Sequence, residues 1–125
     1  MAATEQKAFA EFWSALQAMD ADELARRFAA SGSIAFGASR DVQGREAVRR
    51  EFVRLFARTA SIHGSVVSLW ACGGVAVADS DMAFHFDDGA RVNIPVTLVC
   101  WFSPFGIARS QFSFYPEPAL GRTAA

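Results

Sequence analysis

The chain has 125 residues, of which 52% are hydrophobic and 20% are charged, and its formal net charge is −1. This length suits one domain over residues 1–125, and this composition excludes a disordered or fibrous chain. A near-neutral charge does not support a nucleic-acid-binding surface. No apolar run approaches the roughly 20 residues of a membrane span, and the polar start is unlike a signal peptide. We therefore expect a cytoplasmic protein with frayed ends at residues 1–4 and 121–125.

Helical periodicity dominates the first half of the chain. Apolar residues recur at helical spacing and predict helices over residues 4–19, 21–30 and 45–58. Asp20 is expected to cap the second helix, because Glu23 follows three residues later as in a capping box. A short strand is expected over residues 33–36.

The second half alternates with a period of two. It predicts four strands joined by short glycine-containing turns, over residues 62–72, 75–86, 90–103 and 107–115. Pro95 interrupts the third of these strands and predicts a bulge or bend. Cys72 and Cys100 lie in apolar strand patterns, so we expect buried, reduced thiols. With 12 Phe residues and one Tyr, the chain also predicts a large apolar interior.

Several short segments carry a family resemblance over roughly residues 5–120. They are Ala18-Met19-Asp20-Ala21-Asp22-Glu23-Leu24, Gly44-Arg45-Glu46-Ala47-Val48-Arg49, Asp87-Asp88-Gly89 followed by Pro95, and Tyr115-Pro116-Glu117-Pro118. Their order resembles the nuclear transport factor 2-like superfamily, in its SnoaL-like and ketosteroid isomerase-like branch. The resemblance implies an α+β fold, a cystatin-like cone of three N-terminal helices packed on a strongly curved antiparallel sheet. It also implies an apolar pocket and a homodimer through the outer sheet face.

The family's known catalytic groups are replaced in this sequence. By the resemblance, ketosteroid isomerases have a tyrosine where Phe12 stands, a base where Phe36 or a neighbouring small residue stands, and an acid where Thr97 stands. The epoxide hydrolase pair matches Asp79 and Asp81, but its arginine is missing. Neither a steroid isomerase nor an epoxide hydrolase mechanism is expected.

The strand over residues 75–86 has two chemically different sides. One side carries Asp79, Asp81 and His85, and the other carries Met82, Phe84 and Phe86. The resemblance implies that the acidic side faces the pocket and that the apolar side meets a second subunit. Hydrophobicity alone favours the opposite arrangement, and both stay open at this stage.

If the acidic side faces an apolar pocket, Asp81 is the candidate general acid or base and His85 is its candidate partner. Candidate ligand-binding residues, with Asn93 as a further polar group, are Phe12, Trp13, Phe36, Asp79, Thr97, Trp101, Phe112 and Phe114. No metal or cofactor is expected, because His63 and His85 are far apart in sequence and no Gly-rich phosphate loop is present.

The resulting hypothesis is a small-molecule-binding domain for an apolar or aromatic ligand. Its enzymatic version is cofactor-independent acid–base catalysis of the isomerase, cyclase or hydratase/hydrolase type. The alternative is a non-catalytic ligand-binding or protein-interaction module. Two or more converging ionisable groups with shifted pKa values in the pocket would favour the enzyme.

Overall fold

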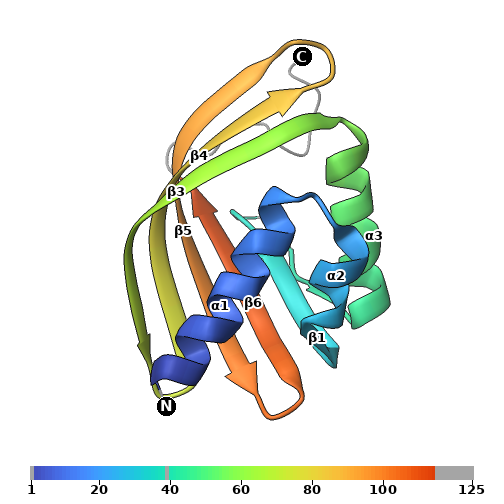
Figure 1. Ribbon diagram of the computed structural model, residues 1–125. Coiled ribbons are helices and arrows are strands. Elements are labelled where there is room, and N and C mark those ends of the chain that lie inside the picture. The colour runs from blue at the N-terminus through green and yellow to red at the C-terminus, as the bar shows by residue number, and fades with distance from the viewer. Residues whose placement is uncertain (1, 39, 115–125) are drawn as a thin grey trace.

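The computed structural model describes residues 2–38 and 40–114, and these form three helices and one curled sheet (Figure 1). The α+β prediction is confirmed. The helices are α1 (Ala2–Gln17), α2 (Ala21–Arg26) and α3 (Arg45–Ala57). The strands are β1 (Phe28–Phe36), β2 (Val42–Gln43), β3 (Thr59–Cys72), β4 (Val75–Phe86), β5 (Arg91–Ser103) and β6 (Gly106–Phe114).

The sheet has six strands in the order β2-β1-β6-β5-β4-β3. Strands β3 to β6 form the predicted antiparallel meander, while β1 pairs parallel to β6 with Phe36 beside Phe112. Figure 1 shows the sheet curling around α1, with α2 and α3 packed beside β1. The concave face of the sheet therefore meets the helices, and the opposite face is left uncovered by them.

The second helix is shorter than its periodicity predicts. It begins as expected, with the Asp20 carboxylate accepting the backbone N–H of Glu23 at 3.0 Å. It ends at Arg26, because the Arg27 carbonyl accepts the N–H of Ile107 at 2.8 Å and Phe28 pairs with Ile107 in the sheet. The strand predicted over residues 33–36 consequently begins at Phe28. The partner strand that captures these residues is about eighty positions away, so local periodicity carries no trace of it.

The core lies between α1, α3 and the concave face of the sheet. Phe12 on α1, Phe52 on α3 and Leu98 on β5 are completely buried. Removing a side chain of this size from water stabilises the fold by about 1.5–3 kcal/mol. The concave side of β4 is formed by its buried positions, which are Ala76, Ala78, Ser80, Met82 and Phe84.

Two expectations about single residues are corrected: Pro95 forms no bulge, and Cys72 is not buried. Pro95 causes no register shift, since the β4–β5 pairing is continuous through Asp81 and Pro95. The shifts lie in β3, between Thr59 and Ser61 and between Val66 and Ser68. Within the described residues β6 pairs with β5 only as far as Val96, so no ladder hydrogen bond from Pro95 is required on that side. Cys100 is buried as expected, but Cys72 is exposed at the end of β3.

The predicted turns contain glycines with positive φ, at Gly73, Gly74, Gly89 and Gly106. The segment Tyr115-Pro116-Glu117-Pro118 and the expected frayed tail lie outside the described residues. Gly106 combines a φ of 123° with a close approach, because a Cβ there would stand 2.8 Å from the Arg27 carbonyl oxygen. Gly89 has a φ of 90° with nothing within 4 Å.

Substituting Gly89 and Gly106 distinguishes the energetic cost of backbone strain from the additional cost of a close contact. Gly89→Ala should lower the free energy of unfolding by about 1 kcal/mol through strain alone, and Gly106→Ala by roughly 3 kcal/mol or more. Urea unfolding of both variants measures the difference. Equal losses would mean that the contact between the β5–β6 turn and the α2–β1 junction does not constrain the fold.

Candidate functional site

A continuous series of aromatic rings runs through the interior of the molecule. Phe12 contacts Phe112 with ring centroids 6.2 Å apart, and Phe112 contacts Phe36 at 4.9 Å. Phe36 then meets Phe52 at 5.8 Å, and Phe52 stacks on Phe56 at 5.7 Å. The structure thus brings three of the predicted ligand-binding residues, Phe12, Phe36 and Phe112, together on the inner face. Phe12 and Phe112 are fully packed, whereas Phe36 is half-buried.

Burial decreases toward one end of this series. The ends of β1, β6 and α3 and the β4–β5 hairpin point toward the same end of the molecule (Figure 1). Half-buried apolar side chains on these segments pack against the core, and we call them the upper apolar cluster: Phe36, Phe56, Phe86, Val92 and Phe114. The upper apolar cluster is thus a half-buried apolar margin of the core at this end of the described residues.

Trp13 fills the interior farther along α1. Its ring stacks on Phe9 with centroids 6.1 Å apart and lies against β3 at Gly64, where a Cβ would come within 2.8 Å of the indole. Glycine at position 64 therefore makes room for the indole. Trp13 packs α1 onto the sheet rather than presenting a free surface to a ligand.

The buried polar groups of the interior are used by the fold. The Ser80 hydroxyl donates to the Val96 carbonyl at 2.8 Å, and the Thr59 hydroxyl donates to the Leu55 carbonyl at 2.6 Å. Cys100 lies 3.6 Å from the Ser110 hydroxyl, and burial raises the pKa of its thiol to about 12. A thiol that stays protonated is a poor nucleophile.

Glu5 is the buried carboxylate of the described residues. One of its oxygens accepts the backbone N–H of Gly74, which fastens the start of α1 to the β3–β4 hairpin, and its Oε1 has no hydrogen-bond partner among the described residues. This contact lies at the opposite end of the molecule from the upper apolar cluster (Figure 1). Glu5 is thus remote from the upper apolar cluster.

The acidic side of β4 does not face the interior, which corrects the expectation taken from the resemblance. Met82 and Phe84 are buried on the concave face, whereas Asp81 is exposed and Asp79 and His85 are half-buried on the outer face. Burying two large apolar side chains is favourable, while burying unpaired carboxylates is costly. The outer face also holds three more of the proposed site residues: Asn93, Thr97 and Trp101.

Asp79 and Asp81 differ in their partners although they share a strand and a face. The Asp79 carboxylate accepts the Thr97 hydroxyl at 2.9 Å and the Ser68 hydroxyl at 3.5 Å. Asp81 stands between Ser65 and Pro95, and its carboxylate accepts no hydrogen bond from any described residue. Asp79 and Thr97 therefore satisfy each other, and Asp81 is the unpaired acid of the outer face.

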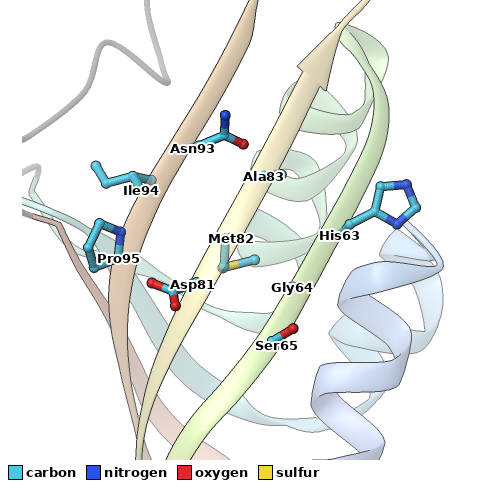
Figure 2. Close-up of a pocket in the computed structure, with 9 residues that line it drawn as sticks. All are labelled: His63, Gly64, Ser65, Asp81, Met82, Ala83, Asn93, Ile94 and Pro95. Carbon is cyan, nitrogen blue, oxygen red and sulfur yellow. The ribbon is translucent and has the colours of Figure 1, made fainter.

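A shallow recess of about 450 Å³ surrounds Asp81 on the outer face (Figure 2). The small side chain of Ala83 occupies its centre, with His63 and Asn93 directly across on β3 and β5. The lining residues are His63, Gly64, Ser65, Asp81, Met82, Ala83, Asn93, Ile94 and Pro95. The recess is open to solvent on the outer face, unlike the interior pocket expected around Asp81.

His85 lies beyond Ala83 on the same strand, and its ring meets that of His63. Their centroids are 6.2 Å apart with the ring planes at 88°. Sequence reasoning set these two histidines far apart, since nothing in it fixed the β3–β4 register. No group of three or more His, Cys, Asp and Glu side chains in residues 2–38 and 40–114 is arranged to hold a metal ion.

Acidic residues with shifted pKa values lie on the helices, away from both faces of the sheet. The hydrogen bond from Arg26, and then that from Arg27, lowers the pKa of Glu23 on α2. The hydrogen bond from Arg49 lowers the pKa of Glu46 on α3. These are exposed ion pairs on a helix surface. In the part of the chain that the structure describes, no helix is long and apolar enough to span a membrane.

Comparison with known proteins places this geometry in a family. The SnoaL-like domain model matches residues 9–107. The comparison with curated proteins gives no match.

Three solved structures share the fold. A hypothetical protein from Catenulispora acidiphila with a ketosteroid isomerase-like fold, solved in complex with trimethylamine, has a TM-score of 0.78 at 17% identity, with 94% of each chain covered. A putative SnoaL-like polyketide cyclase from Shewanella denitrificans has a TM-score of 0.78 at 13% identity, covering 91% of this chain and 93% of that chain. An epoxide hydrolase of the LEH-like type from M. tuberculosis has a TM-score of 0.76 at 18% identity, covering 86% and 80%. At these identities the structures show the nuclear transport factor 2-like fold, and the family match shows that this chain belongs to the SnoaL-like domain family.

Proposed function

We propose that this chain binds a small apolar or aromatic molecule at the upper apolar cluster, without acid–base catalysis. The observation that carries the proposal is the combination of half-buried Phe36, Phe56 and Phe114 with an interior whose buried hydroxyls already have partners. Half-buried aromatic side chains at the end of a core offer contact area to an apolar ligand at little cost in polar desolvation.

The positions of the described ionisable side chains favour ligand binding over acid–base catalysis. General acid–base chemistry requires a titratable group within hydrogen-bond reach of the reacting atoms. Asp81 and His85, the predicted pair, are on the outer face, and the described carboxylate inside the molecule is Glu5 at the far end. The trimethylamine complex of the Catenulispora acidiphila protein suggests the scale of the ligand, since that molecule is small and carries three methyl groups.

The apolar probe 8-anilinonaphthalene-1-sulfonate tests the proposal by fluorescence titration of the folded protein. Phe56→Ser should weaken probe binding about fivefold, because it removes roughly 1 kcal/mol of half-buried aromatic contact. Val53→Ser is the matched control, since Val53 is an exposed apolar residue on the same helix. Equal affinities in both variants, or a folded parent that leaves the probe dark, would contradict the proposal.

We further propose that the outer face of the sheet binds a second copy of this chain. The residues expected in that role, Met82, Phe84 and Phe86, instead line the inner face. The apolar surface available is on β3 beside the start of β4, where Trp70 is 58% exposed. Trp70 pairs with Val77 across the sheet.

Charge complementarity favours a second copy as the occupant of this surface. Val77 and Val99 are paired at its centre, with Asp79 one step along the strands on one side and Arg109 one step along on the other. A two-fold axis crossing the strands at Val77 lays the Asp79 side of one copy over the Arg109 side of the other, although within each copy Arg109 also forms an ion pair with Asp41. The same operation places apolar residues on apolar residues at the centre of the contact.

Light scattering tests the assembly. The parent should have twice the chain mass of 13.5 kDa, and Trp70→Glu should raise the dimer dissociation constant at least about tenfold, because a buried indole is replaced by a charge. Phe105→Glu is the control, since Phe105 is 83% exposed in the β5–β6 turn. A monomeric parent, or equal dissociation constants for the two variants, would refute this contact.

A further inference from the structure

The histidines of this chain, His63 and His85, are its only two, and both lie on the outer face of adjacent strands. His85 pairs with Ser61, and His63 pairs with Ala83, so the two histidines are diagonal neighbours. Diagonal neighbours on one face of an antiparallel pair are about 7–8 Å apart, within reach of long side chains. From this geometry we infer that His63 and His85 form a two-histidine site for a divalent transition-metal ion.

The distance between the rings is close to the value that a shared ion requires. A zinc ion lies about 2.0–2.1 Å from each imidazole nitrogen, which puts two ring centroids roughly 5 Å apart at a tetrahedral angle. The observed separation is 6.2 Å, with the rings nearly perpendicular. Closing the remaining ångström requires only side-chain rotation, because both rings project from paired strands whose backbones are held by the β3–β4 ladder.

Both imidazoles have nitrogens available for coordination. Neither ring makes a hydrogen bond or ion pair to any described residue, and their contact is with each other. On the same face, Asp79 and Thr97 are already hydrogen-bonded. Metal coordination would therefore break no interaction of the fold at His63 or His85.

The surroundings suit a cation whose remaining ligands are water. Asp81 is the unpaired acid diagonal to His63, and Asp87 follows His85 by two residues. Arg91 on β5 is paired with His85, and its positive charge offsets part of the negative charge of the two carboxylates. Ala83, whose side chain is small, lies between His63 and Asn93 among the residues that line the recess (Figure 2). Imidazole nitrogens select zinc, copper or nickel over magnesium, which prefers oxygen ligands.

Zinc titration of the full chain followed by imidazole NMR tests the inference. The titration uses the Cys72→Ser background, since the exposed Cys72 thiol is a competing zinc ligand. Both histidine spin systems should shift together and saturate at one equivalent of Zn²⁺, with no response to Mg²⁺.

Single variants identify the ligands. His63→Gln and His85→Gln should each weaken Zn²⁺ binding at least about tenfold. Asn93→Ala, a change in the same recess, should leave it unchanged. A response of one imidazole alone, two independent zinc equivalents, or an unaltered affinity in either histidine variant would overturn the inference. The zinc titration of the Cys72→Ser protein alone shows whether one or both imidazoles respond and how many zinc equivalents bind. Those two outcomes are decided even if a histidine variant fails to fold.

Discussion

The packing of one side of β4 against the helices determines the chemistry of the whole sheet. Side chains alternate along a strand, so burying Met82 and Phe84 sends every residue of the Asp79, Asp81 and His85 series to the outer face. Cross-strand pairing extends this choice to β5, where Asn93 and Thr97 follow. The concave face of the sheet consequently carries apolar side chains and hydrogen-bonded hydroxyls, and the unpaired Asp81 carboxylate lies on the outer face.

Much of the architecture is predictable from the sequence because its signals are local. The stripe on α1, the Asp20 cap and the glycines of the turns each depend on neighbours within a few residues, and each matches the structure. The start of β1 at Phe28 depends on pairing with Ile107, and the bulge beside Val66 depends on the curvature of the assembled sheet. Features set by distant strands leave no periodicity to detect.

The candidate site shows the same division. Phe12, Phe36 and Phe112 lie on the inner face, as the apolar patterns around them predict, whereas Trp101 is 37% exposed on the outer face. The face of Asp81 is misassigned because a strand pattern gives two faces without saying which one is concave. Here hydrophobicity was the better guide than a register carried over from distant relatives, whose shared fold does not fix which groups line the interior. The contact of His63 with His85 needs the β3–β4 register, which a hairpin turn alone does not fix once β3 contains two shifts.

The outer face becomes more polar along β4 from Val77 to His85. The proposed dimer contact and the proposed metal site therefore lie at opposite ends of the strand. Val77 and Trp70 make one end apolar, while His85 and Arg91 make the other end polar. Eight residues from Val77 to His85 span roughly 27 Å of extended strand, far more than the reach of a side chain. Between these two ends, the Asp79 carboxylate accepts the Thr97 hydroxyl. Neither side chain is therefore apolar, and neither is free to coordinate an ion. Contact with a second copy at one end and coordination of an ion at the other therefore depend on different residues, even though one strand supplies both.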